Sequence, residues 1–167
     1  MRFSRRALLV SILVGAALVS ILAGAAILSP LVGNADELGA INTLGSDGVA
    51  IRGTDPVAYF TESRPVAGDP AITLDYRGVE WRFASEENKS LFAAEPEKYE
   101  PAYGGYCAYG VAQGYLVKIE PDAWTIHDGR LYLNYDLRVR DTWLQDVPGY
   151  IAKADQNFPK LVPGGAG

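Results

Sequence analysis

An Asp-Gly pair joins two short apolar runs in the stretch Trp124-Thr125-Ile126-His127-Asp128-Gly129-Arg130-Leu131-Tyr132-Leu133-Asn134. A two-residue hairpin turn needs a positive φ at both central positions, and Asp-Gly accepts this conformation readily. Apolar and β-branched residues on each side of the pair are typical of strands. The stretch therefore predicts a β-hairpin that turns at Asp128 and Gly129.

A similar unit lies 51 residues upstream. Two alternating runs, 72–76 and 79–83, flank Arg77-Gly78, which predicts a second hairpin. Residues with the same expected role recur at this offset: Gly78 with Gly129, Trp81 with Tyr132, Ser85 with Asp136, Phe92 with Trp143, Glu95 with Asp146, and Tyr99 with Tyr150. We therefore expect a small α+β domain made of two similar β-hairpin plus helix units.

The other elements are expected to be short. Ser85 is placed to cap a helix that Pro96 ends or restarts, and Asp55-Pro56 is placed to open one helical turn. Helices are also expected from about residue 137 to 144 and from about 148 to 157, with a short helix carrying Cys107 within 104–113. The apolar run 49–52 is expected to form an edge strand.

The N-terminus has the pattern of a membrane-insertion signal. Arg2, Arg5 and Arg6 precede an uncharged stretch over residues 7–28. Its length is close to the ~20 residues that span a bilayer, which favours an anchor in the inner membrane. Gly33-Asn34-Ala35 offers a signal-peptidase site, so a cleaved signal is the alternative. Either way we expect an extracytoplasmic protein on the periplasmic side.

The expected organisation is a signal peptide or transmembrane anchor over 1–35, a linker over 36–48, one domain over 49–161 and a flexible tail over 162–167. The chain has 15 basic and 20 acidic residues. Three of the basic residues precede residue 36, which leaves 12 against 20 in the exported part. Because nucleic-acid binding depends on clustered Lys and Arg, this balance argues against a nucleic-acid partner.

The motifs of the first unit resemble the YHS domain, a small module usually described as heavy-metal associated. The resemblance rests on Asp55-Pro56-Val57, on residues 78–85, on Phe92 and on Pro96-Glu97-Lys98-Tyr99. It extends to a secreted branch of that family through the segments 55–60, 103–108, 131–135 and 154–159. It implies an extracytoplasmic binding module that covers nearly all of the expected domain.

The resemblance also identifies the positions of the family's metal ligands. Metal-associated YHS modules carry cysteine where this chain has Ala58, Ala84 and Asn88. Soft metals need thiolate, thioether or imidazole donors, so the usual site is lost. Cys107 and His127 remain as candidate ligands, and two donors do not complete a tetrahedral zinc site. A linear two-coordinate copper(I) site, or one shared between molecules, stays open as an alternative.

Cys107 is the sole cysteine of the chain. Members of the secreted branch described as selenoproteins carry selenocysteine at its place, which implies that a reactive, low-pKa group is useful there. We expect the Gly104-Gly105 pair and a nearby helix N-terminus to stabilise a Cys107 thiolate. The alternative is a buried, inert thiol, because unpaired cysteines are among the most buried residues.

Three functions follow from these observations. The first is an extracytoplasmic YHS-like binding module that holds a soft metal such as copper, or a thiol ligand, through Cys107. The second is a thiol-dependent redox protein, with a reductant as partner. The third is a structural or interaction domain without chemistry. The sequence contains none of the common enzyme motifs, and we expect a monomer unless Cys107 links two chains.

Overall fold

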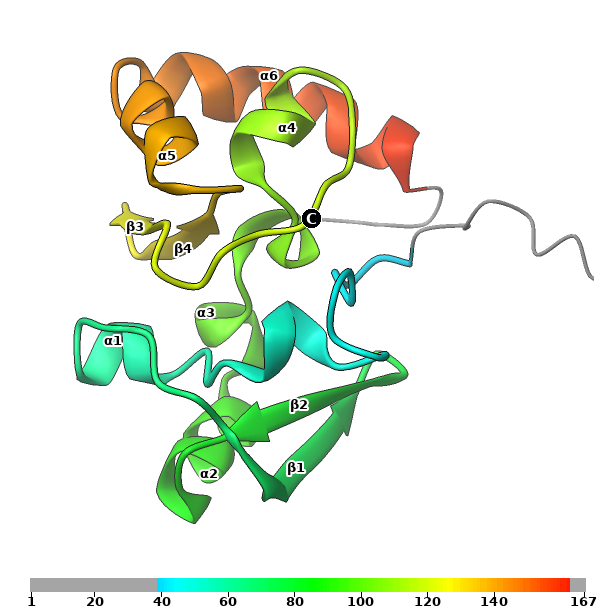
Figure 1. Cartoon of the computed structure of the whole chain (residues 1–167), viewed down its shortest axis with the longest axis vertical. Helices are drawn as coiled ribbons and strands as arrows, with labels where there is room; N and C mark the ends of the chain where they lie inside the picture. Colours follow the sequence, from blue (N-terminus) through cyan, green and yellow to red (C-terminus); the bar gives the residue numbers. More distant parts are fainter. Residues whose placement is uncertain (1–38, 163–167) are drawn as a thin grey trace, which may run out of the picture. The chain divides into compact units, whose positions relative to one another are not determined.

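Two β-hairpins, each preceded and followed by short helices, organise the computed structural model, which describes residues 39–162 (Figure 1). The first half contains η1 (Ala50–Gly53), α1 (Ala58–Thr61), β1 (Asp69–Tyr76), β2 (Val79–Phe83), α2 (Glu86–Ala94) and α3 (Pro96–Tyr99). The second half contains η2 (Ala102–Gly105), α4 (Ala108–Ala112), β3 (Trp124–His127), β4 (Arg130–Leu133), α5 (Leu137–Trp143) and α6 (Val147–Leu161). The order of element types is the same in both halves, and η denotes a 3-10 helix.

The expected α+β class is confirmed for the described residues. They contain six α-helices and two separate antiparallel sheets of two strands each. The expected membrane segment 7–28 and the cleavage site after Ala35 lie outside the described residues, as do residues 163–167. Among residues 39–162, no helix combines the length and apolar character needed to cross a bilayer.

Both hairpins turn where the sequence predicted. Arg77 and Gly78 have φ values of 55° and 74°, and Asp128 and Gly129 have φ values of 49° and 76°. These are the left-handed conformations of a two-residue hairpin loop. β1 begins at Asp69, before the predicted start at residue 72, and an irregularity between Asp69 and Thr73 interrupts its register with β2.

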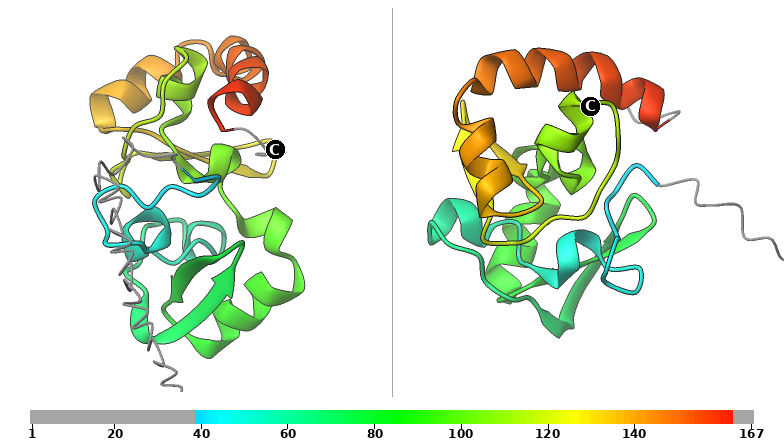
Figure 2. Two further views of the ribbon diagram at one scale, coloured as in Figure 1. Left: turned by 90° about the vertical axis from the view of Figure 1, so that its right-hand side faces the viewer. Right: turned by 45° about the horizontal axis from the view of Figure 1, so that its top comes forward.

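The predicted helix caps are also confirmed. Ser85 Oγ accepts the Asn88 N–H at 3.1 Å, and Asp136 Oδ1 accepts the Val139 N–H at 2.8 Å. Each bond satisfies a backbone donor that the helix leaves unpaired in its first turn. α6 runs to Leu161 and is longer than predicted. It packs beside α4 (Figure 2), where Asn157 Nδ2 donates to the Val111 and Ala112 carbonyls at 3.1 and 3.2 Å.

The edge strand predicted over 49–52 is wrong. These residues lead into η1, where Ile51 and Arg52 have φ values of 39° and 61°, and only Val49 makes an isolated bridge, with Glu80. Ile51 is fully buried and its N–H donates to the Asn42 carbonyl at 3.0 Å. An apolar run of four residues indicates burial, and it does not distinguish a strand from a buried turn.

Each half has an aromatic core built at matched positions. Trp81 and Phe92 lie with ring centroids 5.1 Å apart in the first half, and Tyr132 and Trp143 lie 5.4 Å apart in the second. All four side chains are buried. The matched pairs are those predicted from the offset of 51 residues, so the aromatic pattern was a correct guide to the core.

Asn42 joins the two halves. Its N–H and its Nδ2 donate to the carbonyls of Gly104 and Gly105, both at 2.9 Å, and its side chain is buried. A Cβ on Gly104 would collide with the Ala40 carbonyl oxygen, and one on Gly105 would collide with Ile51 Cγ2. The glycine pair therefore permits close packing against residues 40–51, and this differs from its expected role of stabilising a Cys107 thiolate.

Candidate functional site

Cys107 is the N-cap of α4 and is 1% exposed. Its Sγ accepts the backbone N–H of Gly110 at 3.3 Å. The short helix expected within 104–113 is present but begins only at Ala108, because Tyr103 and Gly104 have φ values of 57° and 60°. The sulfur nevertheless lies at the N-terminal end of a helix, as expected.

Asn134 faces the sulfur from the end of β4 and is fully buried. Its Oδ1 accepts the Tyr109 N–H at 3.3 Å and lies 3.8 Å from Cys107 Sγ. A carbonyl oxygen has no hydrogen to donate, so this contact is favourable when the S–H donates to it. Asn134 Nδ2 makes no hydrogen bond with any residue of the described part of the chain.

The surroundings of Cys107 therefore favour the neutral thiol. Burial raises its pKa, and the backbone N–H groups of Gly110, Tyr135 and Tyr109 oppose this rise without cancelling it. As expected, backbone N–H groups at the start of α4 stabilise the thiolate and lower the pKa of Cys107, but the effect of burial is larger. Because the thiolate is the nucleophilic form, the site lowers the reactivity of Cys107.

His127 and Cys107 are not brought together. His127 is paired with Arg130 at the turn end of the second hairpin, and its Nε2 lies 3.5 Å from Asp128 Oδ2. Cys107 forms a bridge with Leu133, whose partner is Trp124 at the other end of the hairpin. The two ends are three residue steps apart along β4, which is about 10 Å. Within residues 39–162, no three His, Cys, Asp or Glu side chains are grouped as a metal site requires.

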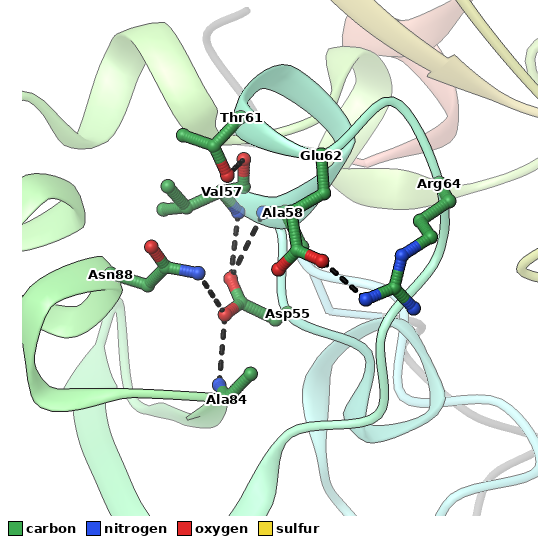
Figure 3. Close-up of polar contacts among 8 residues, drawn as sticks. All are labelled: Asp55, Val57, Ala58, Thr61, Glu62, Arg64, Ala84 and Asn88. Carbon is green, nitrogen blue, oxygen red and sulfur yellow. Dashed lines mark hydrogen bonds and ion pairs between the residues drawn. The ribbon is translucent and has the colours of Figure 1, made fainter.

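Asp55 is a buried carboxylate at the centre of the first half (Figure 3). Its Oδ1 accepts the N–H groups of Val57 at 2.8 Å and Ala58 at 3.3 Å. Its Oδ2 accepts the Ala84 N–H at 2.8 Å and Asn88 Nδ2 at 2.7 Å. The predicted capping role is confirmed, and the second pair of bonds was not predicted.

The three positions that the resemblance to YHS modules identified as ligand positions surround this carboxylate. Ala58, Ala84 and Asn88 each donate one hydrogen bond to Asp55. Two of these bonds come from the backbone, so alanine is sufficient at those positions. The neighbouring Thr61 hydroxyl bonds to the Val57 carbonyl, and the exposed Glu62–Arg64 pair lies at the end of α1 (Figure 3).

A cleft that the sequence did not predict lies beside the turns of the hairpins. It encloses about 420 Å³ and draws its lining from both halves: Ala40, Arg77, Glu97, Lys98, Glu100, Pro101, Tyr103, Gly104, Gly129, Arg130 and Phe158. An adjoining hollow of about 310 Å³ shares Tyr103, Arg130 and Phe158 and adds Asp155 and Pro159. The lining residues are scattered between positions 40 and 159, so no motif could have found them.

Charged and hydroxyl groups line this cleft. Glu100 Oε1 lies 3.1 Å from Arg77 Nη1, and Glu100 Oε2 accepts the Tyr76 hydroxyl at 3.3 Å. Burial raises the pKa of Glu100, and the Arg77 charge opposes this rise. The Tyr103 hydroxyl donates to Asp155 Oδ1 at 2.9 Å, and burial raises the pKa of Tyr103.

Comparison of the chain with protein-family models, with curated proteins and with solved structures found no match.

Proposed function

We propose that residues 49–161 form a YHS-like binding module that acts on the extracytoplasmic side of the inner membrane and holds a small ligand in the cleft. In this proposal the chain is exported, or anchored through residues 7–28, and works as a monomer. The two halves are proposed to be copies of one ancestral unit. The repeated element order and the matched aromatic pairs support this origin.

The observation that carries the proposal is the cleft of about 420 Å³. Ligand pockets usually measure ~300–1,000 Å³ and contain a few placed polar groups. Arg77 lies in the first hairpin and Glu100 directly follows α3, whereas Tyr103 and Arg130 belong to the second half. Tyr103 also packs on Tyr132, so the aromatic core of the second half supports one wall of the cleft.

Cys107 is assigned a structural role in this proposal. Its sulfur is buried, caps α4 and has a raised pKa. Because Cys107 is buried, a copper ion, a thiol ligand or a reductant could reach the sulfur only after the surrounding structure opened. These three features favour the buried, inert thiol over the redox protein and over metal binding through Cys107 and His127.

The test is equilibrium dialysis of the purified protein, in the form that the cell exports, against a small-molecule extract of the extracytoplasmic compartment. Retained compounds are identified by mass spectrometry. Ala40→Trp adds bulk to the cleft lining, and Ala93→Trp adds the same bulk to an exposed position of α2 that is outside the lining. We expect a compound that the wild type and A93W retain and that A40W does not.

Two outcomes would contradict the proposal. One is that A40W, with an unchanged thermal unfolding midpoint, retains the same compounds as the wild type. The other is that the extract leaves a covalent adduct on Cys107, seen as an increase in intact mass, and no non-covalent ligand. The second outcome would favour the redox function.

A further inference from the structure

We propose that the cleft binds a small organic carboxylate and that the guanidinium of Arg130 holds it. This inference rests on the proposed function, since it names the ligand chemistry of the same cleft. It starts from the position of Arg130, the residue that follows the Asp128-Gly129 turn and begins β4. Pairing with His127 fixes its backbone, while its side chain is exposed and lines both hollows.

The charge of Arg130 acts directly on the groups of the cleft. It opposes the rise in pKa that burial causes at Glu100, Tyr103 and Tyr132. The lining residues place Arg130 at the junction of the two hollows, with Glu100 in the lining of the first and Tyr103 in the lining of both.

The other cations of the cleft already have partners. Arg77 Nη1 is bonded to Glu100. Lys98 Nζ donates to Glu95 Oε2 at 3.0 Å and lies over the Tyr99 ring. Within residues 39–162, the Arg130 guanidinium makes no ion pair or hydrogen bond, although Asp155 lines the same hollow. Its donors are therefore available to a ligand.

The carboxylates nearest to Arg130 are also occupied. Glu100 accepts from Arg77 and from the Tyr76 hydroxyl, and Asp155 accepts from the Tyr103 hydroxyl. Each carboxylate gains less from Arg130 when it is already bonded. A ligand carboxylate can instead take two parallel N–H bonds from the guanidinium, which is the geometry that arginine favours.

The charge of the lining distinguishes a carboxylate from a phosphate. Glu97 and Glu100 also line the cleft, and the chain has a net charge of −5. Both repel an anion, and the repulsion is larger for a phosphate with nearly two charges than for a carboxylate with one. Glu97 is exposed and makes no ion pair or side-chain hydrogen bond with any residue of 39–162, so an ammonium group on the ligand would add to binding.

The experiment is a titration of the full chain, purified with the membrane segment retained or removed as the cell processes it, by calorimetry and by the amide shift of Gly129. The probes are acetate, L-alanine and inorganic phosphate. The variants are Arg130→Gln, Arg130→Lys and Arg64→Gln, the last being an exposed arginine outside the cleft lining. Thermal unfolding midpoints confirm that each variant is folded.

We expect acetate or L-alanine to bind saturably to the wild type and to R64Q, at least tenfold more weakly to R130Q, and with intermediate strength to R130K, which keeps the charge and loses the paired N–H donors. Tighter binding of L-alanine than of acetate supports a contribution from Glu97, and equal binding supports recognition of the carboxylate alone.

The inference is overturned if neither carboxylate saturates the wild type, if R130Q binds as the wild type does, or if phosphate binds more tightly than both. A compound retained from the extract by the wild type and lost in A40W, together with any of these results, would leave the proposed function standing and remove the carboxylate assignment.

Discussion

Asp55 and Cys107 occupy matching places in the two halves of the chain. Each side chain accepts backbone N–H groups at the start of a short helix, Asp55 from Val57 and Ala58 before and in α1, and Cys107 from Gly110 in α4. Asp55 also accepts the N–H of Ala84, and the N–H of Tyr135, the match of Ala84 at an offset of 51, acts on the Cys107 sulfur. The second half thus holds a neutral thiol where the first holds a carboxylate.

Loss of the Asp55 carboxylate should destabilise the protein strongly. Asp55→Asn replaces one acceptor oxygen by an N–H₂ group that would face buried N–H donors, and a buried donor without an acceptor costs ~1–3 kcal/mol. We expect D55N to lower the free energy of unfolding by about 3 kcal/mol in urea titrations.

The matched control for D55N is Asp136→Asn, which changes the cap of α5 where one backbone N–H is bonded. Asn and Asp are nearly equal as caps, so the expected loss is less than about 0.5 kcal/mol. Equal losses in the two variants would show that the four bonds of Asp55 carry no special stability.

Substitutions at Cys107 should reveal its capping role. Serine keeps a group that accepts from Gly110 and donates to Asn134, whereas alanine removes both interactions. We therefore expect Cys107→Ala to be less stable than Cys107→Ser by about 1 kcal/mol, the usual value of a cap. If Cys107 were only an apolar filler, alanine would be the better replacement and the order would reverse.

The pH dependence of stability should report the raised pKa of Cys107. The unfolded thiol ionises near pH ~8.5 and the folded thiol at a higher pH, so the folded state holds its proton longer. Stability linked to this group is fully present below pH ~8.5 and is lost as pH rises through the folded pKa. The unfolding free energy of the wild type minus that of C107S should therefore decrease from pH 7.5 to pH 10. An increase of this quantity over the same range would mean that the folded pKa of Cys107 is depressed.

Close packing at Gly104 gives a further test of the fold. Gly104→Ala combines a φ of +60° with a collision against the Ala40 carbonyl oxygen. Gly114→Ala has a φ of +90° and no atom within 4 Å of the new Cβ, so it isolates the conformational cost, about 1–2 kcal/mol. We expect G104A to lose clearly more stability than G114A in thermal unfolding, and equal losses would contradict the contact between residues 40–42 and η2.

Local signals in the sequence were sufficient for the hairpins, the caps and the aromatic cores. Gly78 and Gly129 mark turns whose chemistry depends on neighbours only, and Trp81 and Tyr132 follow the strand period. The match between Asp55 and Cys107 was missed because it needs an offset of 52, while the hairpins align at 51 and place Tyr106 opposite Asp55. The first half has one additional residue between Asp55 and its hairpin, and no periodic pattern in this segment reveals it.

The cleft and the state of Cys107 depend on contacts between distant segments. Cys107 belongs to a core cluster whose members lie between positions 41 and 133, and the lining of the cleft comes from both halves. Positive φ values at Ile51 and Tyr103, which bring these segments together, are unusual for such residues. The low propensity of isoleucine and tyrosine for positive φ therefore argued against the turns that position the site.

The most direct test of the central claim compares Cys107→Ser with Ala40→Trp in the same dialysis and mass spectrometry experiment. We expect C107S to retain the ligand of the wild type and A40W to lose it, with both variants folded. Loss of the ligand in C107S together with its retention in A40W would contradict binding in the cleft and would place the function at the Cys107 sulfur.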